Sequence, residues 1–334
     1  MENKVYYLID KATFELQKQE LDSLHADYVR IRFLYCGICG GDYSCFLGRR
    51  SNYPYTLGHE FVAEVVEIGK NVVDFSEHDF VVSDFNFRCN KCSYCLEGKD
   101  HLCKYNNIGY FTNRAYADYA DVHYKYLYKI LPLNNIINAT LIEPLSCVIH
   151  AYEEIQKVDA YPNTVLIVGL GNIGMLFAFY LSSIIKIQNI FVYDNVPEKM
   201  KRVTNLFNCK SLNLINCTDY DFIIDATNTE SGAHFCLNIS RYSQKYCMMS
   251  HLYGLDTSFI YEEMCRKEIY PLFPLRNGNS GNIIKSMRII KDYWRSEYET
   301  TMESFPITKI QQVFESKETL LSNKQIISIF DLTD

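Results

Sequence analysis

Four closely spaced cysteines constrain this chain more than any other feature. They follow the pattern C-x2-C-x2-C-x7-C, at Cys89, Cys92, Cys95 and Cys103. Two-residue gaps let successive thiolates face one tetrahedral centre, and four sulfur ligands leave no open position on a zinc ion. The pattern therefore predicts a structural zinc site. The alternative, four unrelated buried cysteines, would place the charged neighbours Lys91 and Glu97 in a core, which is unfavourable.

Length and composition indicate a globular protein of two domains. The chain has 334 residues, of which 48% are hydrophobic and 22% charged, and one ordinary domain has roughly 150 residues. A net charge of −7 argues against nucleic acid as the partner, since phosphate backbones need a basic face. The thirteen cysteines are an odd number, which fits a reducing cytoplasm better than a secreted disulfide scaffold. Without a signal-like start or a long apolar stretch, we expect a cytoplasmic protein with no membrane partner.

The pattern of hydrophobic and turn-forming residues changes near Ala139. From Val29 to about Tyr128, short β-branched and aromatic runs alternate with Gly, Asn and Pro, which predicts a β-rich region. After that, a helix is expected over 140–155, followed by a fully buried strand over 165–168. Further strands are expected over 190–193, 222–225 and 246–250, with helical segments between them. This alternation predicts an α/β fold with a doubly wound parallel sheet.

A glycine-rich motif directly follows the buried strand. Gly169-Leu170-Gly171-Asn172-Ile173-Gly174 matches G-x-G-x-x-G and precedes an apolar helix expected over 175–185. In this context the first glycine permits a tight turn, the second lets the backbone approach a pyrophosphate, and the third allows close packing of helix on strand. The motif therefore predicts a dinucleotide site at the helix N-terminus.

Asp194 ends the next predicted strand, twenty residues after Gly174. A carboxylate there accepts both ribose hydroxyls of NAD and repels the 2′-phosphate of NADP. NAD(H) is therefore the expected cofactor. The basic residues Lys199, Lys201 and Arg202 follow closely enough to keep NADP(H) open as the less favoured alternative.

Two short segments bring a second set of metal-binding residue types together. Cys39 and Asp42 lie in one, and His59 and Glu60 in the other, about twenty residues later. A catalytic zinc site is typically formed by cysteine, histidine and carboxylate ligands, with the remaining ligand position open to water. Asp42 is expected to bond the other nitrogen of His59 and fix its tautomer. The neighbouring thiols are expected to be small buried residues rather than ligands; they are Cys36, Cys45 and Cys147.

Together with Leu141-Ile142-Glu143-Pro144-Leu145-Ser146, these motifs resemble the zinc-dependent medium-chain dehydrogenase/reductases of the alcohol dehydrogenase superfamily. The segment 142–150, IEPLSCVIH, looks most like the sorbitol and polyol dehydrogenases. The resemblance implies two zinc ions per chain, with Cys39 and His59 as ligands of the catalytic one and with Glu60 and Glu143 as oxygen ligands, direct or through water.

The resemblance also implies an architecture. Residues 1–150 would form a GroES-like catalytic domain, with the zinc lobe over 89–103 and with 286–334 completing it through a last strand over 324–329. Residues 151–285 would form a Rossmann domain. Members of the family commonly form dimers and tetramers, so the resemblance implies a homodimer or homotetramer. The implied reaction interconverts a secondary alcohol and a ketone on a polyol or sugar-derived small molecule.

The chain departs from the family at the proton relay. A hydroxyl residue commonly stands two positions after the zinc cysteine, where this chain has Gly41, and Ser44 stands where a histidine often does. Three accounts remain open. Ser44, Tyr43 or a water replaces the relay; or Glu60 or Glu143 carries the proton; or the reaction is slow or lost.

Two other functions stay open. The segment 38–50, ICGGDYSCFLGRR, also resembles ribulose-5-phosphate reductases, in which Arg49 and Arg50 would clamp a substrate phosphate. Those enzymes tend to lack the four-cysteine lobe and to use NADPH, which Asp194 disfavours, and both arginines could instead be solvated loop residues. Arg276, in the proline-containing segment 269–280, is a further candidate for contact with substrate or cofactor. The last alternative is a non-catalytic zinc and dinucleotide-binding redox sensor.

Overall fold

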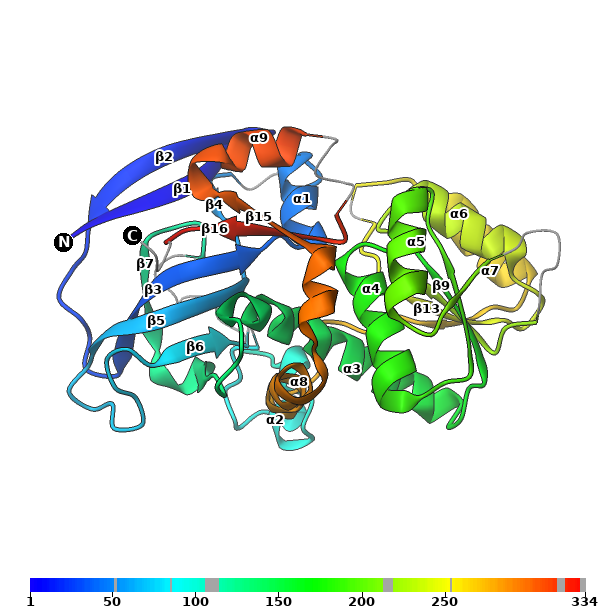
Figure 1. Ribbon diagram of the computed structural model, residues 1–334, viewed down its shortest axis with the longest axis horizontal. Helices are drawn as coiled ribbons and strands as arrows, with labels where there is room; N and C mark the ends of the chain where they lie inside the picture. Colours follow the sequence, from blue (N-terminus) through cyan, green and yellow to red (C-terminus); the bar gives the residue numbers. More distant parts are fainter. Residues whose placement is uncertain are drawn as a thin grey trace.

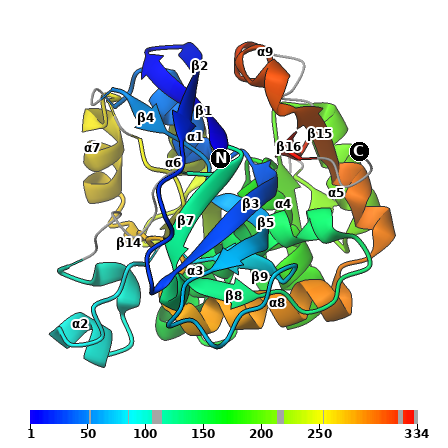
Figure 2. The same ribbon diagram turned by 90° about the vertical axis from the view of Figure 1, so that its left-hand side faces the viewer.

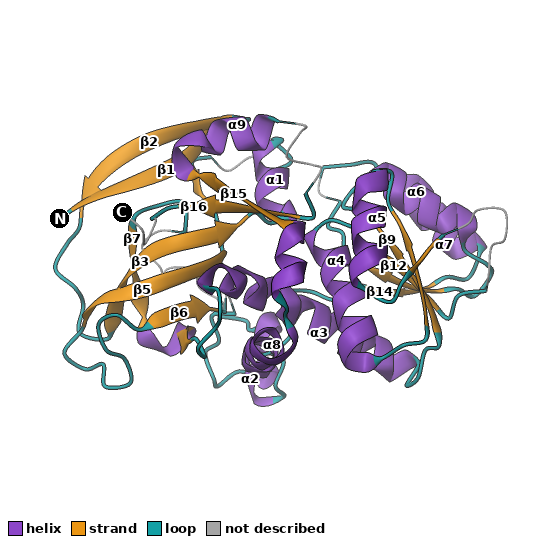
Figure 3. Ribbon diagram, in the orientation of Figure 1, coloured by secondary structure: helices purple, strands orange, loops and turns teal. Residues whose placement is uncertain are grey.

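Two large β-sheets of different kinds lie on opposite sides of a central group of helices (Figures 1 and 3). The computed structural model describes residues 1–50, 53–84, 86–105, 114–212, 219–252, 254–316 and 322–330. One large sheet is entirely parallel and the other mostly antiparallel. The α/β fold class, with a GroES-like β-rich part and a Rossmann part, is confirmed.

The parallel sheet has the order β11-β10-β9-β12-β13-β14. Numbered along the chain, this is the 3-2-1-4-5-6 order of the dinucleotide-binding fold, whose ligand crevice lies beyond the carboxyl ends of the strands. The strands are β9 Thr164–Val168, β10 Asn189–Tyr193, β11 Lys210–Ser211, β12 Phe222–Asp225, β13 Lys245–Met248 and β14 Tyr270–Leu272. The connecting helices are α4 Asn172–Phe179, α5 Pro197–Leu206, α6 Glu230–Ile239 and α7 Ser258–Arg266.

The second large sheet has the order β15-β16-β3-β5-β6-β8, with β7 also paired to β3. Its strands are β3 Tyr28–Gly37, β5 Glu60–Ile68, β6 Phe80–Ser83, β7 Tyr119–His123, β8 Leu127–Lys129, β15 Met302–Pro306 and β16 Lys324–Ser328. The C-terminal strand β16 thus returns to the N-terminal part of the chain and pairs with β3.

Three other strands form a small sheet beside it, in the order β2-β1-β4, with bounds β1 Glu2–Asp10, β2 Thr13–Glu20 and β4 Tyr55–Thr56. The helices of this part are α1 Gly40–Phe46, α2 Ser93–Leu96 and α9 Ile310–Glu315. Figure 2 shows α2 projecting away from the strands.

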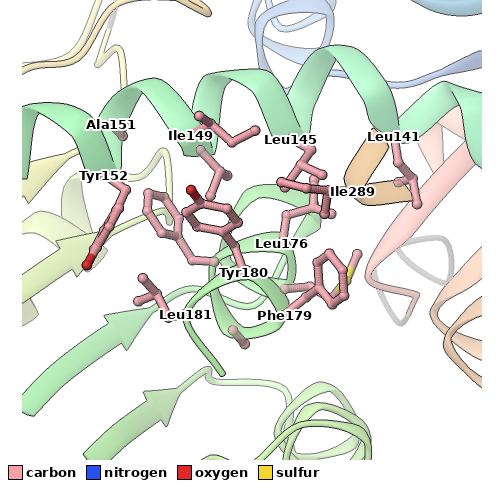
Figure 4. Close-up of a cluster of buried hydrophobic side chains, with 14 of the residues drawn as sticks. Leu141, Leu145, Ile149, Ala151, Tyr152, Leu176, Phe179, Tyr180, Leu181 and Ile289 are labelled. Carbon is pink, nitrogen blue, oxygen red and sulfur yellow. The ribbon is translucent and has the colours of Figure 1, made fainter. Parts of the chain in front are cut away.

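Two longer helices join the two parts, α3 Ile142–Val158 and α8 Ser280–Tyr293. Leu145, Ile149 and Tyr152 lie three or four positions apart and so share one face of α3. That face packs on α4 and the π-helical turn that follows it, through Leu176 and Tyr180 among others (Figure 4). Each fully buried leucine or isoleucine contributes about 1.5–3 kcal/mol. This core extends to Leu34 and Val62 of the antiparallel sheet, so the start of α3 is held firmly between both parts.

The predicted elements were confirmed with small shifts. The helix expected over 140–155 is α3, and the strand expected over 324–329 is β16. The helix expected over 175–185 begins earlier, at Asn172, because the glycine motif itself supplies its first turn, and it continues as a π-helical turn over Tyr180–Ile185. The exact domain limits stay a prediction. No helix among the described residues has the length and apolar character to span a bilayer.

Candidate active site

Cys39, His59 and Glu60 converge at one edge of the antiparallel sheet. One ligand atom from each lies within 4.8 Å of the others. Strand pairing explains this, because Gly37 at the end of β3 lies opposite Glu60 at the start of β5. Ligand atoms of a tetrahedral zinc ion are roughly 3.3–3.8 Å apart for bonds of about 2.0–2.3 Å. The donor set therefore fits zinc and leaves room for a further ligand.

Asp42 lies beside this cluster, and both of its carboxylate oxygens accept hydrogen bonds. Its Oδ2 atom accepts bonds from the Cys39 N–H at 3.2 Å and the Tyr116 hydroxyl at 3.4 Å, and its Oδ1 atom accepts the Gly58 N–H at 3.4 Å. Oδ1 lies 3.7 Å from His59 Nδ1. Burial raises the pKa of Asp42, but His59, the Cys39 N–H and Arg114 outweigh it, so the pKa lies below its ordinary value. Asp42 is thus an ionised group facing the imidazole.

Glu60 has a partner that sequence reasoning missed. Its Oε2 atom binds the ammonium of Lys324, the first residue of β16, whose side chain is fully buried. A Cβ atom at Gly37 would collide with the ends of both side chains, so the pair would have to shift to accommodate any other residue there. The signal in the sequence was a lysine at the start of the strand expected over 324–329, whose other members include three isoleucines.

Glu143 lies in the first turn of α3, outside the group of three. Desolvation, opposed by His59 and reinforced by Glu60, raises the pKa of Glu143 to about 7. Its Oε1 atom is 3.6 Å from Cys147 Sγ, one helical turn later. Cys36, Cys45 and Cys147 were expected not to bind metal. Among the residues that the structure describes, none of these three belongs to a metal-ligand group.

Ser44 connects the cluster to the parallel sheet. It is buried on α1, the helix whose N-cap is Cys39. Its hydroxyl donates to the Gly40 carbonyl at 3.0 Å and accepts from Asn228 Nδ2 at 3.4 Å. Asn228 follows β12, so the metal cluster lies beside the carboxyl edge of the parallel sheet. The Tyr43 ring instead stacks on aromatic rings of the β-rich core, at 6.2 Å from those of Phe46 and Phe314.

The glycine-rich turn has the geometry of a dinucleotide cradle. Gly169 has a φ of 88°, and a Cβ at Gly174 would collide with the Gly169 carbonyl, whereas a Cβ at Gly171 would meet nothing within 4 Å. Gly171 caps α4 and so leaves space above the helix N-terminus. In the described part of the chain, neither buried polar atom of the Asn172 side chain has a hydrogen-bond partner. These features fit a bound pyrophosphate.

Asp194 lies at the end of β10, beside this turn. Its Oδ2 atom accepts the Leu170 N–H at 2.6 Å and its Oδ1 atom accepts the Val196 N–H at 2.8 Å. Each carboxylate oxygen can accept a second bond. The carboxylate is therefore oriented by backbone and still able to receive ribose hydroxyls.

The four cysteines of the lobe gather as their spacing predicted. All four sulfurs lie within 4.8 Å of one another, with separations of 3.6 Å for Cys92 to Cys95, 3.9 Å for Cys92 to Cys103 and 4.0 Å for Cys89 to Cys95. Zinc bonded to four sulfurs at about 2.3 Å requires roughly 3.8 Å. Backbone N–H groups lower the pKa of Cys92 to about 6, which favours the thiolate. This lobe fits a closed zinc site.

Comparisons with known proteins agree with this geometry. Residues 25–132 match the family described as alcohol dehydrogenase GroES-like domain. The chain is 35% identical to D-arabitol-phosphate dehydrogenase of Enterococcus avium over 170 residues, 50% of this chain and 47% of that protein. It is 29% identical to an NAD-dependent alcohol dehydrogenase of Saccharolobus solfataricus over 288 residues, 78% of this chain and 81% of that protein.

The match to the first of these relatives spans about half of that protein's length. The crystal structure of galactitol-1-phosphate dehydrogenase from Escherichia coli has the same fold, with a TM-score of 0.79, 18% identity and coverage of 98% of this chain and 100% of that one. Residues 25–132 thus match the alcohol dehydrogenase GroES-like domain family, and the chain is similar to alcohol and polyol dehydrogenases and shares its fold with a solved member of that group.

Proposed function

We propose that the chain is a zinc-dependent NAD(H) oxidoreductase that interconverts a secondary alcohol and a ketone on a polyol or sugar-derived substrate. The observation that carries this proposal is the convergence of Cys39, His59 and Glu60 beside α1, whose Ser44 bonds Asn228 at the carboxyl edge of the parallel sheet. A metal-ligand set and a nucleotide fold meet there, which is what hydride transfer to a metal-held substrate requires.

In this proposal Cys39 and His59 are direct ligands of the catalytic zinc, and Glu60 and Glu143 are oxygen ligands, direct or through water. Asp42 orients His59. Zinc, when bound, supplies Lewis-acid stabilisation of the substrate oxygen. Cys89, Cys92, Cys95 and Cys103 hold the second zinc ion.

Ser44 is the proposed proton carrier in place of the missing hydroxyl at Gly41. Its hydroxyl bonds the carbonyl of Gly40, the residue after Cys39, and the side chain of Asn228, which follows β12 of the parallel sheet. Tyr43 is the weaker candidate, because its ring belongs to an aromatic stack. The Gly169 to Gly174 turn binds the pyrophosphate, and Asp194 binds the ribose and favours NAD(H) over NADP(H).

The D-arabitol-phosphate and galactitol-1-phosphate dehydrogenases among the similar proteins support a polyol-type substrate. The test is metal content combined with NADH oxidation across ketoses and ketose phosphates, on protein purified without chelator. We expect two zinc ions per chain and turnover. C39S should lose one zinc and all turnover, and the matched variant C103S should lose the other zinc. Full zinc and tight NADH binding without turnover on any substrate would overturn the proposal and favour a binding protein.

A further inference from the structure

We propose that the segment 323–325 couples the cofactor turn to the candidate metal centre, so that NADH and the catalytic zinc ion each bind more tightly when the other is present. Asn323 is the positioning residue in this coupling. The inference rests on the proposed function, because it adds a link between the two binding sites of that function. The segment lies at the start of β16, at the boundary between the two parts of the molecule (Figure 1).

Asn323 is hydrogen-bonded to the nucleotide-binding part through both polar atoms of its side chain. Its Nδ2 atom donates to the Leu170 carbonyl at 2.6 Å, and its Oδ1 atom accepts from the Arg202 guanidinium on α5 at 2.9 Å. Its backbone N–H donates to the Thr301 carbonyl at 3.2 Å. The residue is only 2% exposed, so loss of a partner would leave a buried polar group unsatisfied. The positions of Asn323 and Leu170 are therefore tied to one another.

Leu170 is the second residue of the glycine motif, and both of its backbone polar groups are held. Its N–H donates to Asp194 Oδ2 at 2.6 Å, and its carbonyl accepts the bond from Asn323. The C=O and N–H groups of one trans peptide point in opposite directions, so this bond directs the Gly171 N–H to the other side of the turn. We expect that N–H, at the start of α4, to donate to a pyrophosphate oxygen. Asn323 thereby orients the peptide that meets the cofactor.

The next two residues of the segment contact the metal cluster. The Lys324 ammonium binds Glu60 Oε2, and both side chains are buried. The Gln325 carbonyl accepts the N–H of Ile38 at 3.0 Å, and Ile38 is the residue before Cys39. Two members of the metal cluster, one directly and one through its neighbour in the chain, are therefore attached to the segment that holds the nucleotide turn.

The segment can transmit a restraint because its backbone is fixed. It opens the strand β16, which pairs with β15 on one side and β3 on the other. The three residues are consecutive, so a shift of one displaces the other two. A metal ion held by Cys39 and Glu60 restrains the segment, which then holds the Leu170 peptide in place before the cofactor binds. This restraint lowers the entropic cost of cofactor binding, and such coupling is reciprocal between the two ligands.

The test is a double-mutant cycle on NADH affinity, measured by fluorescence titration, with the zinc content of each protein determined by elemental analysis. C39S removes the catalytic zinc and leaves the four-cysteine lobe filled. N323D keeps the shape of the side chain and the acceptor for Arg202, but loses the donor to the Leu170 carbonyl. We expect C39S to weaken NADH binding about fivefold or more in otherwise wild-type protein, and less than about twofold in the N323D background.

A second variant and a control accompany this cycle, and thermal unfolding verifies that each protein is folded. N323A loses both side-chain bonds and should abolish the effect of C39S in the same way. N3A is the matched control, because Asn3 is 0% exposed and its side chain exchanges two bonds of 3.0 Å with the backbone of Tyr119 on β7. In the N3A background the effect of C39S should remain about fivefold or more.

The outcomes distinguish the coupling from the proposed function, since none of these measurements needs turnover. A purely structural role of Asn323 would weaken NADH binding equally with and without the catalytic zinc, and that result would overturn the coupling. Equal NADH affinity in wild type and C39S would also overturn it and leave the proposed function standing. Failure of the wild type to bind NADH would overturn both. By reciprocity, NADH should tighten the binding of one zinc ion per chain in chelator competition, and N323D should remove this effect.

Discussion

The ammonium of Lys324 binds the Oε2 atom of Glu60, which is 264 positions away in the sequence. The side chains are 0% and 2% exposed, so both charges are withdrawn from water. A buried charge is tolerated only with a partner. The C-terminal strand β16 therefore supplies the counter-charge for a residue of the candidate metal cluster, and completes the site as well as the sheet.

Replacing Lys324 by Met should destabilise the protein by about 3–5 kcal/mol, because the Glu60 carboxylate would stay buried without its partner. Urea unfolding of the variant measures this. The double variant E60Q/K324M should recover part of the loss, since no lone charge remains. K285M, which removes a half-exposed pair with Glu153, is the control and should cost less than about 1 kcal/mol. Equal stability of K324M and K285M would contradict the burial of the Lys324 charge.

Local patterns in the sequence predicted most of the fold and part of the site. The cysteine spacing and the glycine motif were informative because their members lie within a few residues of one another and act through backbone geometry. Cys39, His59 and Glu60 could be paired because each lies at a strand end with a recognisable neighbour. Lys324 and Asn323 could not be placed, because their partners lie on distant segments and are brought near only by strand pairing and the contact between the sheets.

The second and third glycines of the nucleotide motif, Gly171 and Gly174, should respond differently to alanine. Gly171 has an ordinary backbone conformation and open space around its missing Cβ, so G171A should keep wild-type stability while the methyl group obstructs the pyrophosphate. We expect NADH affinity to fall about tenfold or more. In G174A the methyl group meets the Gly169 carbonyl, so both stability and affinity should fall. Thermal unfolding and NADH fluorescence titration separate the two cases, and a destabilised G171A would show that the space around this residue is filled.

Asp194 should determine the choice between cofactors. D194A removes the acceptor of ribose hydroxyls and the charge that repels a 2′-phosphate, so NADH affinity should fall about tenfold and NADPH affinity should rise. Burial lowers the pKa of Lys199, and Asp194 lies close enough to oppose that lowering, so Lys199 would be near the phosphate in the variant. Fluorescence titration with both cofactors measures the ratio, with the exposed D292N as control. Parallel losses for NADH and NADPH would indicate that Asp194 acts only by shaping the turn through Leu170 and Val196.

The four-cysteine lobe should affect binding as well as stability, because it is hydrogen-bonded to the loop 273–279, which joins β14 to α8, and to the first residue of α8. Asp100 Oδ2 accepts the N–H of Ser280 at the start of α8 at 3.2 Å, and His101 bonds the Gly278 carbonyl through both its backbone and its ring. Loss of the metal from the lobe would free this contact. We therefore expect C103S to bind one zinc fewer and to raise KM for NADH or substrate several-fold. D100N should keep both zinc ions and show a smaller rise in the same KM, because only the carboxylate at the N-terminus of α8 is weakened. Elemental analysis with steady-state kinetics tests this, and unchanged KM values in a zinc-depleted C103S would limit the lobe to stability.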